Sequence, residues 1–138
     1  MLRFSIRHMD DLYRDLILEH YKRPHHFGEL EERDRTHLAH ETNPLCGDDL
    51  SVQIQVQDGV IKDLRFQGRG CAISQAAASM AADELVAMPV DRAASLDASW
   101  MFEILGVTPS ATRRKCALLG LKAVRAALTG DNDWPRDR

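Results

Sequence analysis

The chain has 138 residues, of which 44% are apolar and 28% charged, and its formal net charge is −3. This balance predicts one soluble domain, with a core at about residues 10–130 and a short polar tail at 131–138 that is expected to be frayed. The negative charge argues against nucleic acid as a partner. No apolar run approaches the roughly 20 residues that span a bilayer, so we expect no membrane partner. Three cysteines form a poor disulfide framework and indicate a reducing cytoplasm.

The first predicted element is a helix that Asp10 and Asp11 open and that Pro24 stops. Its apolar residues fall at helical spacing. Residues 23–45 are polar and lack sustained periodicity, which predicts a loop with a short strand near residues 37–41. His20, His25 and His26 cluster around the end of the helix, and the loop before Cys46 carries two more histidines. We expect these histidines to be solvated, with contact to a partner through His25 or His26 as the alternative.

A hairpin follows. Apolar and polar residues alternate over positions 50–57, the pattern of a half-buried strand, and Asp58-Gly59 marks a turn. A two-residue turn would place charged residues opposite the apolar face of the first strand. A three-residue loop over 57–59, with Gly59 in a G1 bulge, avoids this and pairs Val52 with Leu64. The pattern therefore favours the three-residue loop.

The second half of the chain is predicted to be helical. Residues 73–88 are rich in Ala and Met, free of Gly and Pro, and end before Pro89. One or two short helices are expected within 91–105, and a last helix over 112–129 is capped by Gly130. The elements together predict an α+β fold, in which a small antiparallel sheet packs against several helices.

The three cysteines lie at predicted element boundaries. Cys46 and Cys71 are each next to a glycine, Cys116 follows three basic residues, and Asp48 stands two positions after Cys46. Three thiolates and a carboxylate form a ligand set suited to zinc or an iron–sulfur cluster. The glycines Gly47 and Gly70 would let the backbone approach a bound ion. The competing interpretation is that each cysteine is a small buried apolar residue.

The predicted helices also bear on cysteine reactivity. Cys71 should precede the long helix, and Cys116 should lie in the first turn of the last one. Helix N-termini favour thiolate over thiol, and the basic residues 113–115 add positive charge beside Cys116. We therefore expect Cys116 to be a reactive thiolate at the edge of the core, within reach of a partner.

Three motifs carry a resemblance to a known family. Residues 43–48 (N-P-x-C-G-D), 70–74 (G-C-A-I-S) and 115–116 (K-C) resemble the IscU/SufU/NifU N-terminal family of iron–sulfur cluster assembly proteins. Residues 12–24 are similar to that family's first helix. The resemblance covers about residues 11–129 and implies the SufE/IscU-like α+β fold. It also implies that Cys46, Asp48, Cys71 and Cys116 form the metal or cluster site.

Two branches of this family are matched in part. IscU proteins carry a histidine directly before the third cysteine, whereas this chain has Lys115, as in the SufU branch. Arg113 matches a SufU arginine that would assist chemistry at the site, and residues 108–112 differ from the chaperone-recognition segment of IscU. The interval between Cys71 and Cys116 is nevertheless as short as in IscU.

Three functions remain open at this stage. In the first, a cysteine desulfurase delivers sulfur and a [2Fe–2S] cluster forms on a non-enzymatic scaffold that serves apo iron–sulfur acceptors, with Cys116 as first sulfur acceptor. In the second, a zinc-dependent sulfurtransferase holds Zn²⁺ on the same residues, Cys46 accepts sulfur, and Asp48 or Arg113 assists. The third, a zinc hydrolase with Asp48 as base, lacks a motif such as H-E-x-x-H.

Overall fold

The computed structural model describes residues 13–137. Helical residues 13–22 come first in this part of the chain, consistent with a helix that ends before Pro24; the predicted helix start at Asp10 and Asp11 lies outside the described residues. The elements that follow are η1 (Glu32–Asp34), β1 (His37–Asn43), β2 (Asp48–Gln57), β3 (Val60–Arg69), α2 (Ala72–Leu85), α3 (Val90–Ala94), α4 (Ala98–Leu105) and α5 (Arg114–Thr129).

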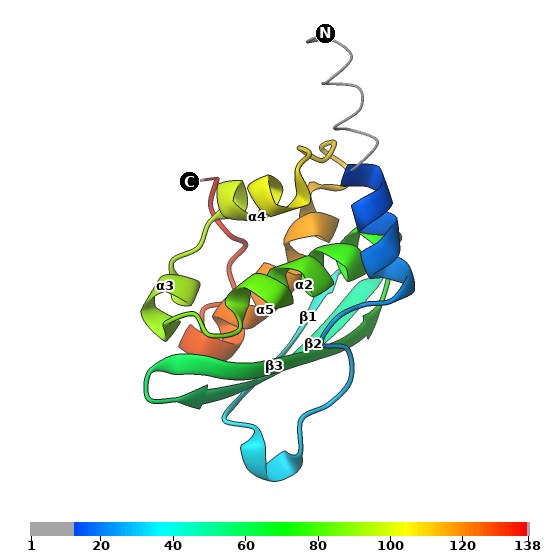
Figure 1. The fold of residues 1–138 in the computed structure, drawn as a ribbon. Helices are drawn as coiled ribbons and strands as arrows, with labels where there is room; N and C mark the ends of the chain where they lie inside the picture. The colour runs from blue at the N-terminus through cyan, green and yellow to red at the C-terminus, as the bar shows by residue number, and fades with distance from the viewer. Residues whose placement is uncertain (1–12, 138) are drawn as a thin grey trace, which may run out of the picture.

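The sheet has three antiparallel strands in the order β1-β2-β3. Helices α2 and α5 pack against each other and cover one face of this sheet (Figure 1). This arrangement confirms the predicted α+β fold. In the part of the chain from residue 13 to residue 137, no helix is both long and apolar enough to cross a membrane.

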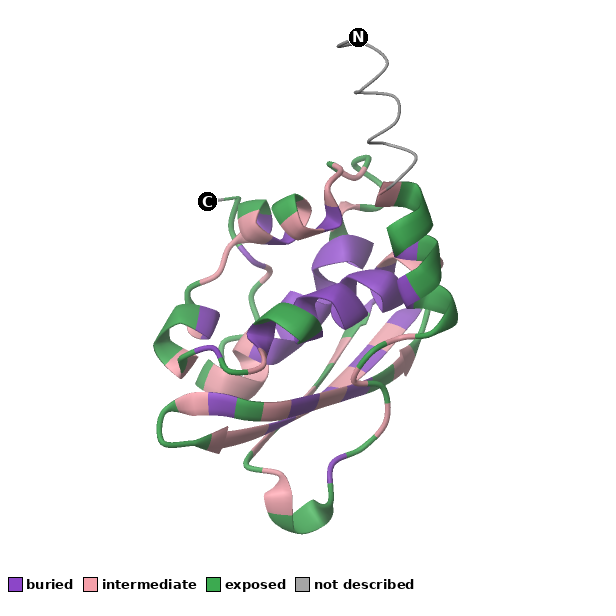
Figure 2. Ribbon diagram, in the orientation of Figure 1, coloured by how far each residue is buried: buried purple, intermediate pink, exposed green. Residues whose placement is uncertain are grey.

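The core lies between the sheet and the two long helices (Figure 2). Along β2 the buried residues alternate with half-buried polar ones, as the sequence pattern predicts. Because side chains of a strand alternate between faces, this spacing directs one apolar row toward α2 and α5. The largest side chains with almost no exposure include Leu50, Ile54, Phe66, Leu85, Met101, Leu119 and Leu121.

The hairpin between β2 and β3 corrects the predicted register. Gln57 pairs with Val60 across a two-residue turn, in which Asp58 and Gly59 have φ angles of 55° and 76°. Positive φ at both central residues is the type I′ geometry that Asp-Gly favours. The extra residue lies further along, between the pairs of Gln55 and Val56, and this irregularity keeps the charged residues of β3 away from the core.

Helix α2 ends three residues earlier than predicted. Ala87 has a φ of 78°, and its amide donates a 2.7 Å hydrogen bond to the carbonyl of Ile61 on β3. The amide of Ile61 in turn donates to the carbonyl of Met88 at 3.0 Å. Hydrogen bonding to the sheet therefore ends the helix before Pro89, which instead precedes α3.

Helices α2 and α5 approach closely at one point. A Cβ added to Gly120 would lie 3.2 Å from the Cα and Cβ atoms of Ala78. Residues 116–124 of α5 are all buried, which means that this stretch of the helix is surrounded on every side. Small residues at the crossing allow this contact between the two backbones.

The C-terminal segment is docked, not frayed as the sequence predicted. The amide of Ala98 donates to the carbonyl of Arg136 at 2.7 Å, and the hydroxyl of Ser99 donates to that of Asp137 at 2.8 Å. Trp134 packs against the core. The ammonium groups of Lys115 and Lys122 lie 5.2 Å and 5.0 Å from the centre of its ring, within the range of a cation–π interaction.

Candidate metal centre

Cys46 lies in the turn that joins β1 to β2. The amides of Cys46 and Gly47 both donate to the carbonyl of Asn43, at 3.1 Å and 2.9 Å. Gly47 has a φ of 71°, a conformation that glycine adopts without steric cost. This turn presents the Cys46 residue to solvent.

Asp48 and Cys71 are joined by hydrogen bonding. Asp48 is the first residue of β2 and is only 1% exposed, and Cys71 is the N-cap of α2. The amide of Cys71 donates to Asp48 Oδ1 at 3.0 Å, and the Cys71 thiol lies 3.8 Å from Oδ2. Gly70 makes this approach possible, because a Cβ there would lie 2.3 Å from Asp48 Oδ1.

Cys116 lies in the first turn of α5 and is fully buried. Its thiol donates to the sulfur of Cys46 at 3.2 Å. The side-chain amide of Asn43 donates to the Cys116 sulfur at 3.7 Å, while Asn43 Oδ1 has no hydrogen-bond partner among residues 13–137. Sequence reasoning quoted Asn43 only as part of a motif and assigned it no role at the site.

Three of the four expected ligands converge on one point, and the fourth lies beside them. Ligand atoms of Cys46, Asp48 and Cys116 all lie within 4.8 Å of one another, and Cys71 adjoins Asp48. Sulfur atoms around tetrahedral zinc are separated by about 3.8 Å, given Zn–S bonds of about 2.3 Å. The 3.2 Å pair of Cys46 and Cys116 therefore needs to open by only about half an ångström, so these residues fit a metal.

The electrostatics correct the prediction for Cys116. Burial, followed by hydrogen bonds with Cys46, Asp48 and Cys71, raises the pKa of the Cys116 thiol far above its ordinary value. The side chains of the two basic residues that directly precede Cys116 contact other parts of the protein. Arg114 pairs with Asp137 and lies over the ring of Phe102, and Lys115 lies over Trp134. Cys116 is thus buried, whereas the sequence predicted an accessible residue at the edge of the core.

Arg113 lies at the N-cap of α5 and is exposed. It lines an open cavity of about 1140 Å³ together with Phe102 and Val107. The same cavity reaches Ala72, the residue after Cys71. The structure therefore places Arg113 on a surface that adjoins the centre.

The two glycines that flank the cysteines differ in their surroundings. At Gly70 an added Cβ would also come within 2.9 Å of Ser74 Oγ, so the absence of a side chain there makes room for protein atoms. At Gly47 the added atom would meet nothing within 4 Å. Only the second glycine, in chain order, makes room for the side chains of the centre.

Comparison with known proteins agrees with this geometry. The model of the NifU-like N terminal domain matches residues 12–132. The chain belongs to this family. The iron-sulfur cluster assembly scaffold protein IscU 1 of Archaeoglobus fulgidus is 31% identical over 117 residues, which cover 85% of this chain and 74% of that protein.

Two further proteins are similar to this chain over a comparable share of its length. The zinc-dependent sulfurtransferase SufU of Bacillus subtilis is 29% identical over 133 residues, covering 84% of this chain and 88% of its own. The crystal structure of a nitrogen-fixing NifU-like protein (N-terminal) from Brucella abortus superposes with a TM-score of 0.67 at 27% identity, covering 86% of this chain and 93% of its own.

Proposed function

We propose that this NifU-like domain supports iron–sulfur cluster assembly, accepting sulfur from a cysteine desulfurase and holding a nascent [2Fe–2S] cluster as its cargo. The observation that carries the proposal is the convergence of three thiols and one buried carboxylate from three separate segments, namely the turn into β2 and the starts of α2 and α5. The relatives named as scaffold proteins support it. Apo iron–sulfur proteins in the cytoplasm would receive the cluster.

The exposure of the cysteines favours Cys46 as the first sulfur acceptor. Cys46 is exposed and Cys116 is fully buried. In the transfer, the Cys46 thiolate attacks the outer sulfur of the desulfurase persulfide. A new S–S bond forms, the old one breaks, and the desulfurase thiolate leaves. This replaces the expectation that Cys116 would act first.

Asp48 is suited to a labile ligand position. A carboxylate oxygen is a harder donor than a thiolate and binds soft iron–sulfur species less firmly. Its hydrogen bond from the Cys71 amide fixes its orientation. A cluster held by three sulfurs and one oxygen would therefore be retained during assembly and released to an acceptor.

A zinc-dependent sulfur transfer is the second candidate, and one observation favours it. Lys115 occupies the position of the IscU histidine, and its ammonium group lies over Trp134 instead of joining the centre. The centre then offers Cys46, Asp48, Cys71 and Cys116 to a single Zn²⁺, from which the exposed Cys46 would be the ligand displaced. In this case the protein would be an enzyme.

Substitution of Asp48 separates the two candidates. For a scaffold, Asp48→Ala should slow cluster release, giving a longer-lived chromophore and slower transfer to an apo-acceptor. For a zinc carrier, the variant should show no chromophore, weaker zinc binding and lower desulfurase stimulation. Asp48→Asn, which keeps an acceptor for the Cys71 amide, tests for misfolding, and Asp49→Ala is the matched control, because Asp49 pairs with His40 outside the centre.

If Asp48→Ala matches the wild type in cluster lifetime, zinc affinity and desulfurase stimulation, Asp48 is not a ligand. Metal analysis of protein purified with and without oxygen completes the test. A chelator-resistant equivalent of zinc supports the carrier, and an oxygen-labile chromophore supports the scaffold. A protein with neither, and with no sulfur accepted from a desulfurase, would refute both.

A further inference from the structure

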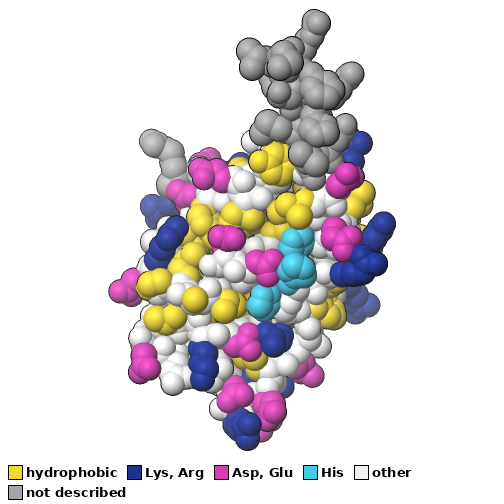
Figure 3. Space-filling model, viewed as in Figure 1, with side chains coloured by type: hydrophobic (Ala, Val, Ile, Leu, Met, Phe, Trp, Pro, Cys, Tyr) yellow, Lys and Arg dark blue, Asp and Glu magenta, His cyan; other side chains and the backbone are white. Residues whose placement is uncertain are grey.

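A second group of potential metal ligands lies away from the cysteines. His20 is on the N-terminal helix, His25 and His26 follow it, and Asp83 is on α2. Sequence reasoning expected solvated histidines here, but His20 is only 7% exposed. Figure 3 shows histidine side chains gathered beside an acidic group on one face of the molecule.

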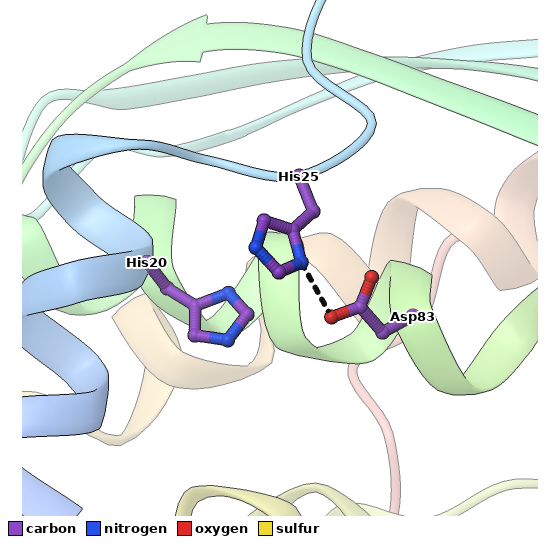
Figure 4. Close-up of side chains that lie close together, drawn as sticks. All are labelled: His20, His25 and Asp83. Carbon is purple, nitrogen blue, oxygen red and sulfur yellow. Dashed lines mark hydrogen bonds and ion pairs between the residues drawn. The ribbon is translucent and has the colours of Figure 1, made fainter.

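Three of these side chains converge (Figure 4). One ligand atom each of His20, His25 and Asp83 lies within 4.8 Å of the other two. His25 Nδ1 is 2.7 Å from Asp83 Oδ2, and the rings of His20 and His25 are 4.4 Å apart between centroids. His26 Nε2 adds a 3.1 Å contact to the other carboxylate oxygen of Asp83.

Ser79 on α2 positions the histidines of this group through its hydroxyl. Its buried hydroxyl is 2.7 Å from His20 Nδ1 and accepts a 2.7 Å hydrogen bond from the backbone amide of His25. A hydrogen bond to one ring nitrogen is the usual way in which a second shell orients a metal-binding histidine. Burial, followed by the neighbouring His25, lowers the pKa of His20, which keeps the imidazole neutral and able to bind a metal.

The backbone of His26 has a strained conformation, which also helps to bring the histidines to Asp83. Its φ of 59° is uncommon for any residue other than glycine. Hydrogen bonds fix the backbone on both sides, because the amide of Phe66 donates to the carbonyl of His26 and the amide of Gly28 donates to that of Phe66. The strained turn places both loop histidines against the Asp83 carboxylate.

We propose that His20, His25 and Asp83 form a second metal site, specific for a divalent first-row transition ion such as Zn²⁺. Imidazole and carboxylate are ligands that these ions accept, and the half-exposed side chains of His25 and Asp83 leave coordination positions open to water. Along α2, Asp83 is 12 residues from Cys71, or about 18 Å at 1.5 Å per residue. The site is therefore separate from the cysteine centre and does not depend on its function.

Binding requires only side-chain movement. With metal–ligand bonds of about 2.1 Å, tetrahedral ligand atoms are about 3.4 Å apart. The 2.7 Å pair of His25 and Asp83 must therefore widen, and His20 must move closer. No covalent or redox step is involved, and the metal takes the place of the direct contact between His25 and Asp83.

Cobalt distinguishes the two sites in the whole protein. Untagged protein is titrated with Co²⁺ under reducing, oxygen-free conditions. Thiolate-bound Co²⁺ gives a sulfur-to-metal charge-transfer band, whereas Co²⁺ bound by imidazole and carboxylate does not. The expected result is two ions per chain, of which only one contributes this band, and Zn²⁺ should displace both.

The variants His25→Ala and Asp83→Asn should each lower the affinity for the ion that gives no charge-transfer band by roughly tenfold or more. Neither variant should change the thiolate band. His37→Ala is the matched control, because His37 is a half-buried histidine on β1, outside this group, whose ring contacts the hydroxyl of Thr36. A single ion per chain that gives the thiolate band, a second ion that increases this band, or equally weakened binding in His37→Ala would overturn the proposal.

Discussion

Replacing Gly70 with alanine should weaken the fold and the metal centre together. The added Cβ would lie 2.3 Å from Asp48 Oδ1, 2.7 Å from Asp48 Cγ and 2.9 Å from Ser74 Oγ. None of these atoms is the end of a long flexible side chain, and Asp48 is buried. The carboxylate must therefore move away from the amide of Cys71, to which it is hydrogen bonded.

The magnitude combines two losses. Gly70 has a φ of 156°, and holding another residue in such a region costs about 1–3 kcal/mol. Loss of the hydrogen bond to the charged carboxylate adds about 1.5–3 kcal/mol. A total of about 2.5–6 kcal/mol corresponds to a midpoint shift of about 1.2–3 M in urea, for an m value of about 2 kcal/mol/M.

Gly47→Ala provides the matched control. Gly47 also has a positive φ, 71°, but an added Cβ meets nothing within 4 Å. Only the backbone cost of about 1–2 kcal/mol applies. Both variants are compared by urea unfolding of the metal-free protein and by zinc competition with a chromophoric chelator. The expected zinc affinity falls at least tenfold for Gly70→Ala and changes little for Gly47→Ala.

Equal stability and equal zinc affinity of the two variants would refute this reasoning. Such a result would mean that Asp48 can move without cost, and that its hydrogen bond to Cys71 does not organise the centre. A loss of stability without a loss of zinc affinity would also contradict it, since the same displacement of Asp48 is expected to cause both.

Three further predictions concern other contacts. Cys116→Ser should lower both zinc content and the zinc-dependent rise in Tm, because metal binding is coupled to folding; full zinc occupancy would exclude Cys116 as a ligand. Lys122→Met should lower the free energy of unfolding in urea by roughly 3 kcal/mol, because Glu41 loses its ion-pair partner and its side chain is only 13% exposed. Adding Glu41→Gln to this variant should recover part of the loss. Gly106→Ala should lower Tm by several degrees, since Gly106 has a φ of 76° and its Cβ would lie 2.1 Å from the ring of Tyr13; an unchanged Tm would show that this ring moves freely.

Local patterns predicted most elements and failed where distant contacts decide. Alternation located β2, and Gly130 ended α5 at φ 80°, because both signals lie within a few residues. The hairpin register was wrong because the extra residue lies inside the ladder, between the pairs of Gln55 and Val56, and not in the loop where the prediction placed it. The end of α2 was wrong because it depends on the hydrogen bond from Ala87 to Ile61, 26 positions earlier in the chain.

The candidate centre shows the same division. The motifs predicted which residues converge, since each cysteine lies at the end of an element and the sheet and helices bring those ends together. The burial of Cys116 could not be predicted, because the basic residues before it suggested an exposed helix start. In the fold, Arg114 and Lys115 are engaged by Asp137 and Trp134, both from the segment predicted to be frayed.

The close contact of α2 and α5 at Ala78 and Gly120 limits how far the two helices can move relative to each other at the metal centre. Each helix carries one of the cysteines at its start, and the two backbones meet with almost no side chain between them. A contact of this kind has little freedom to compress or to repack, unlike one made by long side chains. The distance between two of the sulfur donors is therefore held by stiff backbone. A larger residue at either position would push the two helices apart. This would separate the thiols of Cys71 and Cys116 without direct contact with either.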